Sequence, residues 1–502
     1  MKVFLLYPDR DFDFSADLPR SRDDLTSDLE LSTLLTAMAG GDKFRYETCE
    51  RVLLAGRTEP DLIGYRQDIL ADAIASPGVV RALYEIAVGA LQDKRSVWGF
   101  MWSQNPSSIL SAAVSQLGVL ISRLRQLRRV ADEHAGSFRS AGMTVFFRTV
   151  RSELDDAYFA TLDRHLKQLR FGGGTLISAR LGTDNSGTDY VLRSGQARQG
   201  WRERVGLAPR TMYSFSIPPR DEGGAHALSD LTNRSLNRVA NAAGQSADHV
   251  SGYFTMLRAE LAFYVSCLDL HDRLTAAGVP VTFPRPEPAG SSEWSCSDLR
   301  DACLALRPGE VTGNDVDAAG ARLMIITGAN SGGKSTFLRS AGVAQLMMQC
   351  GMFVTARSFR AGTRTGVFTH FIREEDPALV SGRLDEELGR MSAIADQVAP
   401  GGLILFNESF AATNEREGSE IGRQIVTALL EAGISVMFVT HHFDLADSLY
   451  RQADHPSLFL RAPRQPDGRR DYKLVVAPPL PTSYGQDIYH RIGGWLADDR
   501  EG

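Results

Sequence analysis

The chain has 502 residues, of which 43% are hydrophobic and 23% are charged, and its formal net charge at pH 7 is −6. This composition excludes a disordered or collagen-like chain, and the length predicts about three domains. The negative charge excludes a uniformly cationic protein, so any nucleic acid must be bound by a local basic patch. Five dispersed cysteines without a CxxC pair argue against a disulfide framework and a cysteine zinc site.

Residues 1–58 are interpreted as a small mixed N-terminal segment to which we assign no chemistry. Its apolar start, MKVFLLY, predicts a short strand and is too short for a signal peptide. The longest uncharged stretch, 340–355, contains Ser, Gln and Gly, which favours a buried helix over a membrane span. We therefore expect a cytoplasmic protein that contains no membrane segment.

Residues 59–290 have a helical pattern and are expected to form a core and lever region. Leucines at 117, 120, 124 and 127 share one helix face, and the arginines beside them are interpreted as a solvated face. Two long helices are predicted at 143–169 and 247–276, each about 40 Å long at 1.5 Å per residue. An antiparallel pair of such helices would hold a clamp-like tip near residues 171–220.

The predicted tip begins with two β-like runs and continues with clustered arginines. Guanidinium groups at the end of a lever can grip a phosphate backbone, which makes DNA a candidate partner. A surface loop without a ligand explains the same cluster equally well. The candidate DNA-contact residues are Arg198, Arg202, Arg204 and Arg210.

Strands alternate with helices from about residue 291 onward, which predicts a parallel sheet. A buried strand at 323–326 precedes TGANSGGKST and a helical run, which fits the phosphate loop G-x-x-x-x-G-K-[ST] in its required context. Lys334 is expected to reach the terminal phosphates of ATP, and Ser335 to bind Mg²⁺. The predicted ATP-binding residues are Gly328, Ala329, Asn330, Ser331, Gly332, Gly333, Lys334, Ser335 and Thr336.

Two further predicted strands end in candidate catalytic residues. The strand at 403–406 runs into Asn407 and Glu408, at positions that commonly deliver an Asp to the metal and a Glu to the attacking water. Asn407 is therefore a second metal candidate, and its missing charge predicts slow hydrolysis. The strand at 435–439 runs into His441, which can donate a hydrogen bond to the γ-phosphate. A solvent-facing or structural role is the alternative for this histidine.

The order of these motifs resembles the ATPase domain of the MutS family of DNA mismatch-repair proteins. TGANSGGKST resembles the family's phosphate loop, NESFAATNEREG stands where the family has its Asp-Glu strand end, and VTHHFDL is similar to its His switch. Asn314-Asp315 and Ser483-Tyr484-Gly485 also match the family pattern. The resemblance is specific from about residue 297 to 490 and weaker over the helices from about 60 to 290.

The resemblance implies an α/β P-loop (ABC-type) ATPase domain at 291–502, joined to a predominantly α-helical lever and clamp at 59–290. It also implies a homodimer that associates through the ATPase domains and uses ATP and Mg²⁺. The expected function is that of a DNA-dependent ATPase acting as a nucleotide-gated clamp on DNA in repair or recombination. One alternative is an ATP-binding switch or scaffold with little or no hydrolysis, and a second is an ATP-dependent assembly factor that acts on a protein or RNA.

The chain also departs from the family pattern. The first 60 residues contain no Phe-x-Glu wedge and leave no room for the N-terminal mismatch-recognition domain, so DNA binding is expected not to be mismatch-specific. Ser381 and Gly382 remain from the signature that reaches the partner subunit's ATP. The following residues, 384–387, read LDEE in place of the expected hydroxyls. Their carboxylates would repel a γ-phosphate unless they turn away or pair with a cation such as Arg390.

Overall fold

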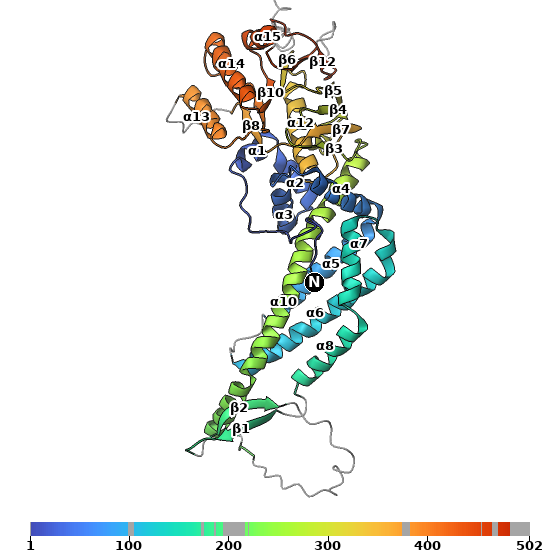
Figure 1. The fold of residues 1–502 in the computed structure, drawn as a ribbon, viewed down its shortest axis with the longest axis vertical. Helices are drawn as coiled ribbons and strands as arrows, with labels where there is room; N and C mark the ends of the chain where they lie inside the picture. Colours follow the sequence, from blue (N-terminus) through green and yellow to red (C-terminus); the bar gives the residue numbers. More distant parts are fainter. Residues whose placement is uncertain are drawn as a thin grey trace, which may run out of the picture. The chain divides into compact units, whose positions relative to one another are not determined.

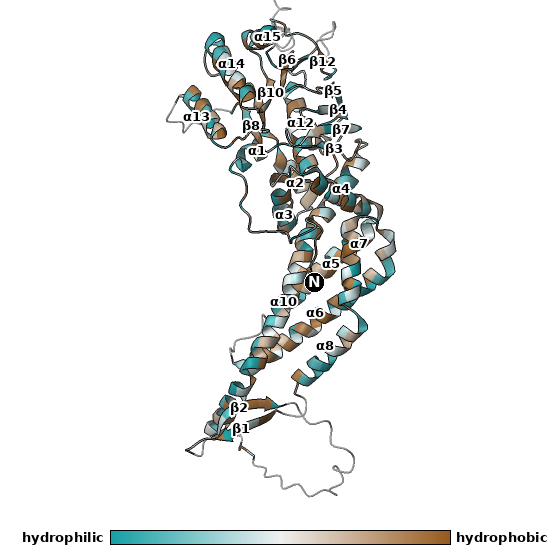
Figure 2. Ribbon diagram, in the orientation of Figure 1, coloured by the Kyte–Doolittle hydropathy of each residue, from teal (hydrophilic) through white to brown (hydrophobic). Residues whose placement is uncertain are grey.

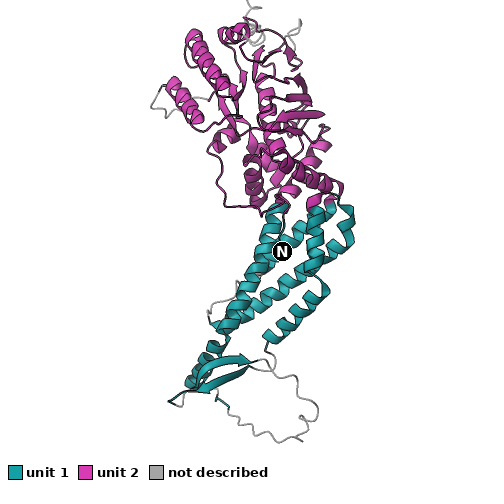
Figure 3. Cartoon of the chain, viewed as in Figure 1, with its two compact units in different colours: residues 1–3, 78–139, 143–261 teal, residues 4–77, 140–142, 262–502 magenta. Residues whose placement is uncertain are grey.

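The computed structural model describes residues 2–98, 105–171, 175–184, 187–193, 216–218, 220–373, 382–452, 454–463 and 470–481. The chain divides into two compact units (Figure 3). Unit 1 comprises residues 1–3, 78–139 and 143–261, and unit 2 comprises 4–77, 140–142 and 262–502. This division differs from the boundaries expected at 58 and 290, because the N-terminal helices pack on the α/β part of the chain.

Unit 1 is built mainly from long helices, labelled in Figure 1. They are α5 (Pro77–Trp98), α6 (Pro106–His134), the short 3₁₀ helix η1 (Ala135–Ser137), α7 (Ala141–Glu153), α8 (Asp156–Leu169) and most of α10 (Glu222–Ala276). Asn105 caps α6, since its side chain accepts a hydrogen bond from the Ser108 backbone N–H at 2.9 Å, and Pro106 occupies the first turn. The predicted leucine face of α6 is buried, which confirms the periodicity argument.

Two helix predictions differ from the structure. The single helix expected at 143–169 is interrupted, because Asp155 leaves the helical conformation and caps α8 by accepting the Tyr158 N–H at 2.7 Å. The helix expected from residue 247 begins at Glu222 instead, so α10 has 55 residues. The additional residues, 222–246, are rich in Ala, Ser and Asn. Hydrophobic periodicity alone therefore does not locate the start of the helix there.

The arginines beside the leucine face of α6 are paired within unit 1. Arg123 lies 2.7 Å from Asp93, Arg125 lies 2.7 Å from Asp163, and both pairs are partly exposed. Among the residues that the structure describes, the segment 106–137 is long and apolar enough to cross a membrane by length and composition, and half of its apolar window is buried. We interpret it as a core helix of unit 1, because its apolar face packs inside that unit.

The predicted β-like runs form an antiparallel hairpin of β1 (Leu176–Leu181) and β2 (Gly187–Arg193). Most of its residues are exposed, including Leu181 at 76%. Two of its arginines already have polar neighbours. Arg193 donates to Ser178 Oγ at 2.8 Å, and Arg180 lies 3.7 Å from Asp189.

Unit 2 begins with an irregular segment rather than the strand expected from MKVFLLY. Its residues are buried, but the carbonyls of Phe4, Leu5 and Leu6 accept hydrogen bonds from the side chains of Tyr65, Tyr264 and Arg66. Side-chain donors thus replace the partner strand that an apolar run usually requires. The segment leads into α1 (Arg22–Asp28), α2 (Leu31–Ala39), α3 (Lys43–Leu54) and α4 (Pro60–Ala75).

Two sheets form the rest of unit 2 (Figure 1). The larger sheet has the order β12-β11-β6-β10-β9-β8, and its strands are parallel except for β12 at one edge. The smaller sheet has the order β3-β7-β4-β5. The strands are β3 (Arg285–Glu287), β4 (Trp294–Leu299), β5 (Asn314–Asp317), β6 (Leu323–Gly328), β7 (Ser358–Gly362), β8 (Val367–Phe371), β9 (Leu403–Asn407), β10 (Ser435–Val439), β11 (Ser457–Ala462) and β12 (Val475–Val476).

Helices cover the larger sheet on both faces. The helices of this part are α11 (Ala302–Ala305), α12 (Lys334–Gln349), α13 (Arg383–Ala395), α14 (Glu415–Glu431) and α15 (Phe443–Gln452). Alternate strand residues such as Ile325, Phe406 and Phe438 pack with α13, α14 and α15. Leu405 faces the opposite way and lies against Gly342 of the buried helix α12. Figure 2 shows hydrophobic residues along these central strands. The predicted alternation of strands and helices is therefore confirmed.

Candidate functional site

The glycine-rich loop at 328–336 joins β6 to α12 (Figure 1). Gly328 and Gly333 have φ values of 106° and 87°, which favour glycine, and Ser331 adopts φ 55°. A Cβ on Gly328 would collide with the carbonyl oxygen of Ala462 on neighbouring β11. The loop therefore needs glycine for backbone conformation and for close packing. It delivers its last residues to the N-terminus of a 16-residue helix, where free N–H groups favour an anion.

Lys334 is the first residue of α12 and folds back over this loop. Its ammonium donates to the carbonyls of Gly328 and Ala329 at 3.2 and 3.0 Å, and its side chain is 5% exposed. Burial lowers the pKa of Lys334 to about 8, against an opposing effect of the nearby Glu408 carboxylate. A cation held in this way inside a glycine-rich loop is suited to a phosphate group.

The two residues predicted to serve the metal are in contact. Ser335 Oγ donates to Asn407 Oδ1 at 2.9 Å, which joins the first turn of α12 to the end of β9. β9 is separated from β6 by β10 in the sheet, so the pairing of parallel strands brings these distant residues to one edge.

Glu408 and His441 follow neighbouring strands, and His441 Nε2 lies within hydrogen-bond distance of Glu408 Oε1, at 2.8 Å. The Glu408 N–H donates to the Val439 carbonyl at 2.8 Å, and Glu408 has φ 56°. The hydrogen bond from His441 lowers the pKa of Glu408 despite burial. The chain's Phe-x-Glu triplet is Phe406-Asn407-Glu408, and Phe406 is fully buried in the sheet rather than exposed as a wedge.

A segment that sequence reasoning missed lies beside the loop. Arg470 donates to the Asn330 carbonyl at 3.3 Å, and Tyr472 lies against Gly333. The side chain of Asn314 holds this segment by donating to the Tyr472 carbonyl at 3.2 Å and accepting the Leu474 N–H at 2.7 Å. The family resemblance included Asn314 but did not predict these contacts. Tyr472 and Leu474 are distant in sequence from Asn314, and no local sequence pattern indicates that they meet.

A buried polar cluster behind Glu408 was also missed. His370 on β8 has one ring nitrogen 2.7 Å from Ser409 Oγ and the other 2.9 Å from the Glu387 carbonyl on α13. Ser409 Oγ in turn donates to the His370 carbonyl, and Phe410 stacks on the imidazole with ring centroids 5.3 Å apart. The turn that carries Glu408 is thus bonded to β8 and to the helix that follows the expected signature.

We expect His370 to make the stability of unit 2 depend on pH. Burial lowers the pKa of His370 to about 4 from an ordinary value of 6.5, so the unfolded chain binds a proton first as the pH falls. The stabilising effect is therefore complete above pH 6.5 and is lost toward pH 4, a change of roughly 3 kcal/mol at 1.36 kcal/mol per unit. Urea titrations at pH 7 and pH 4 give the drop in unfolding free energy between the two pH values. This drop should be smaller in His370→Gln than in the original protein, by about the same amount. An equal loss in both proteins would contradict this role.

The expected trans-acting signature lies partly outside the described residues, which exclude Ser381. Gly382 is described and precedes α13 as its N-cap residue. Asp385 and Glu386 lie in the first turn of α13, where carboxylates are favoured by the helix dipole. Arg390 donates to the Phe371 carbonyl at 2.8 Å and lies 3.8 and 3.9 Å from Asp24 and Asp28 of α1. The described ion pairs of Arg390 are therefore with α1 rather than with residues 385–387.

The four candidate DNA-contact residues, Arg198, Arg202, Arg204 and Arg210, all lie outside the described residues, as does Ser483-Tyr484-Gly485. The described structure therefore leaves these expectations as predictions.

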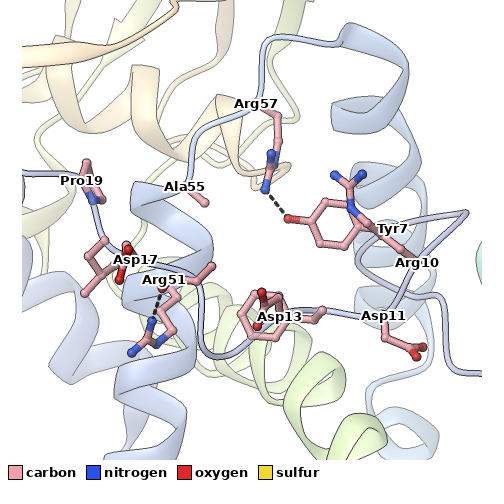
Figure 4. Close-up of a pocket in the computed structure, with 12 residues that line it drawn as sticks. Tyr7, Arg10, Asp11, Asp13, Asp17, Pro19, Arg51, Ala55 and Arg57 are labelled. Carbon is pink, nitrogen blue, oxygen red and sulfur yellow. Dashed lines mark hydrogen bonds between the residues drawn. The ribbon is translucent and has the colours of Figure 1, made fainter. Parts of the chain in front are cut away.

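A hollow of about 230 Å³ lies where the N-terminal segment crosses α3 (Figure 4). Guanidinium groups of Arg10 and Arg57 lie 4.5 and 5.1 Å from the centre of the Tyr7 ring, and Arg57 donates to the Tyr7 hydroxyl. Arg51 on its rim donates to the Ala16 carbonyl at 2.6 Å. Three aspartates, Asp11, Asp13 and Asp17, also line the hollow. The lining therefore carries both positive and negative charges and favours neither an anion nor a cation.

Comparison with known families gives two matches. The MutS2 N-terminal domain matches residues 58–277, and MutS domain V matches residues 324–489. The second range contains the glycine-rich loop, Asn407, Glu408 and His441, which the fold brings together at one end of the parallel sheet.

Similar curated proteins are described as DNA mismatch repair protein MutS. The one from Chloroflexus aurantiacus is 33% identical over 187 residues, covering 36% of this chain and 19% of the relative. That from Syntrophomonas wolfei is 31% identical over 191 residues, covering 37% and 22%, and that from Thermus aquaticus is 30% identical over 185 residues, covering 37% and 22%. The matched part therefore spans about a fifth of the length of these relatives.

The fold and the site define a mixed α/β protein with a glycine-rich loop between a parallel strand and a helix, joined to a helical unit. The matches cover both parts of this arrangement. The chain belongs to the MutS family.

Proposed function

We propose that this protein is a MutS-type ATPase whose unit 2 contains a P-loop domain of the ABC type. The contact between Ser335 on the loop and Asn407 at the end of β9 carries this proposal. It supports a single site that combines phosphate-binding groups, metal-facing oxygens and a carboxylate for water. Family membership suggests ATP binding and DNA association, since the relatives are named as mismatch-repair proteins.

Each residue of the site is assigned a role. Residues 328–336 surround the phosphates with backbone N–H groups, and Lys334 neutralises the terminal phosphates. Glu408 orients and polarises the attacking water, because its pKa is held low and it stays ionised. His441 holds the Glu408 carboxylate at 2.8 Å and would respond to the γ-phosphate through that bond.

The residues present fit Mg²⁺ as an ion carried mainly by the nucleotide. Ser335 and Asn407 offer two neighbouring oxygens, and oxygen ligands are what Mg²⁺ prefers. In the described part of the chain no cluster of three or more His, Cys, Asp or Glu side chains could hold a metal by itself. Bound Mg²⁺ would neutralise charge on the phosphates, with Ser335 as its protein ligand and Asn407 as a weak, uncharged helper.

The wider proposal is a homodimeric, nucleotide-gated clamp on DNA that works in the cytoplasm. The helical unit, which matches the MutS2 N-terminal domain, supports a lever, and the hairpin β1-β2 supports a tip. DNA would be gripped through its backbone by Arg198, Arg202, Arg204 and Arg210, without mismatch reading. Gly382, together with Ser381, would face the partner subunit's nucleotide.

Mg²⁺-dependent ATP turnover, measured with and without duplex DNA, tests the enzyme assignment. We expect slow turnover that DNA stimulates, because Asn407 lacks the charge that would fix the metal. Replacing Asn407 with Asp should raise turnover roughly tenfold. Asn414→Asp is the control, because it makes the same amide-to-carboxylate change at the N-cap of α14. ATP binding with no turnover in either protein would favour the alternative, a switch or scaffold.

The salt dependence of DNA binding tests the clamp tip. Each phosphate contact contributes a slope of about −0.9 in log affinity against log salt. Arg198→Ala, Arg202→Ala and Arg204→Ala together are expected to reduce the slope by about 2 to 3. An unchanged slope would reject the tip assignment while leaving the ATPase assignment intact.

A further inference from the structure

A second cavity lies at the end of the large sheet opposite the glycine-rich loop. It has a volume of about 380 Å³. Arg322, Thr365, Gly401 and Ser435 line it, and they lie at or just before the amino ends of β6, β8, β9 and β10. These strands are parallel, so their amino ends lie along one edge of the sheet. At 3.3 Å per residue, the length of β6 places this edge about 20 Å from the glycine-rich loop. The turn at 289–292 completes the lining.

The cavity is positively charged. Two arginines and no carboxylate line it, since its residues are Ala289, Gly290, Ser291, Ser292, Arg322, Arg364, Thr365, Pro400, Gly401, Gly433 and Ser435. In the described part of the chain neither Arg322 nor Arg364 forms an ion pair. This contrasts with the three carboxylates that line the hollow around Tyr7.

Arg364 is the unusual member of this lining. It is 4% exposed, and its Nη1 donates to Ser435 Oγ at 2.9 Å. Its Nε is buried and has no hydrogen-bond partner among the residues that the structure describes. Burial, followed by the charge of Arg322, lowers the pKa of Arg364 to about 10, so the side chain is still a cation at neutral pH.

A buried cation without a counter-ion is costly, and buried charges in proteins are normally paired. An anion in the cavity would supply the missing partner of Arg364 and remove the repulsion between the two arginines. Guanidinium groups bind phosphate through paired N–H donors, and the polar residues Ser291 and Thr365 line the same space. The volume lies within the range of small-molecule sites.

We propose that this cavity binds a phosphate group, free or as the monoester of a small molecule, between Arg322 and Arg364. The site is separate from the proposed ATP site and does not depend on ATP hydrolysis. Exposed Arg322 would meet the anion at the mouth, and the guanidinium of Arg364 would hold it at the base.

Thermal unfolding and calorimetric titration with inorganic phosphate test the proposal. The Lys334→Met background prevents phosphate from binding at the glycine-rich loop, and sodium chloride of equal ionic strength is the reference. We expect phosphate to raise Tm, and Arg322→Gln to weaken phosphate binding at least tenfold. Arg285→Gln is the matched control, since Arg285 is exposed on β3 and does not line the cavity.

Two results would overturn the proposal. One is equal phosphate affinity in Arg322→Gln and Arg285→Gln, and the other is loss of all phosphate binding in the Lys334→Met background. Arg364→Lys, which keeps the charge but loses Nε, should also weaken binding, although Arg322→Gln decides the matter if that variant does not fold. Tighter binding of glycerol phosphate than of inorganic phosphate would assign a monoester, and equal binding would assign the free ion.

Discussion

Replacing Lys334 with methionine is expected to weaken ATP binding roughly hundredfold and to abolish turnover. The ammonium is held over the loop by two carbonyls at 3.2 and 3.0 Å, where it can reach a bound phosphate. A hydrogen bond to a charged group is worth about 1.5–3 kcal/mol, and each 1.4 kcal/mol corresponds to a factor of ten. Methionine keeps most of the side-chain volume but has no charge. Calorimetric titration with ATP, with and without Mg²⁺, measures the effect.

The Lys334→Met variant is not expected to lose stability. Burial places the folded-state pKa of Lys334 at about 8, below the value near 10.5 of the unfolded chain. Because the unfolded chain binds this proton more strongly, the lysine lowers stability below pH 8 and this cost disappears as the pH rises to 10.5. This gain is offset by the loss of the hydrogen bonds to the Gly328 and Ala329 carbonyls, so unfolding free energies at pH 7 should differ little between the variant and the original protein. ATP affinity close to that of the original protein would reject the phosphate-loop assignment.

Replacing Arg66 with methionine is expected to lower the free energy of unfolding of unit 2 by about 2–6 kcal/mol. Arg66 is 1% exposed, and it donates to the carbonyls of Leu6 at 2.9 Å and Cys350 at 3.2 Å. Its guanidinium also lies 4.8 Å from the centre of the Tyr7 ring. Methionine would remove both of these buried hydrogen bonds, at about 1–3 kcal/mol each.

Urea denaturation measures this loss, with Arg51→Met as the matched control. Arg51 also contacts the N-terminal segment, through the Ala16 carbonyl and the Phe14 ring, but its hydrogen bond is exposed. Its replacement should cost less than about 1 kcal/mol. Equal losses in the two variants would show that Arg66 does not anchor the segment to the end of α12.

Local sequence was sufficient for the main parts of the candidate site. The loop at 328–336, Glu408 and His441 each directly follow a short apolar strand, and a strand followed by a turn is readable from neighbouring residues. Their meeting at one edge also follows from the prediction that these strands are parallel. The cluster of His370, Ser409 and Glu387 was not predictable in this way, because its members come from three elements with no shared motif.

Helix ends were harder to predict than helix existence. Asp155 could be read as an interior residue of one amphipathic helix, and only the folded chain shows that it caps α8. The start of α10 at Glu222 lies 25 residues before the predicted start, in a stretch of small and polar residues. Residues 222–230 are mostly exposed, and the buried residues that follow, Ser235, Leu236, Ala240 and Ala243, are mostly small, so this stretch has only a weak hydrophobic periodicity.

The sequence by itself determined the residues of the candidate site: the glycine-rich loop, the uncharged Asn407 and the strands that carry them. Tertiary structure decided which distant residues support that chemistry. It placed the buried N-terminal carbonyls against Tyr65, Tyr264 and Arg66, and it left the Nε of Arg364 buried without a hydrogen-bond partner among the described residues. The reason is that hydrogen bonding and charge pairing between distant segments depend on packing in space, which local propensity and spacing do not encode.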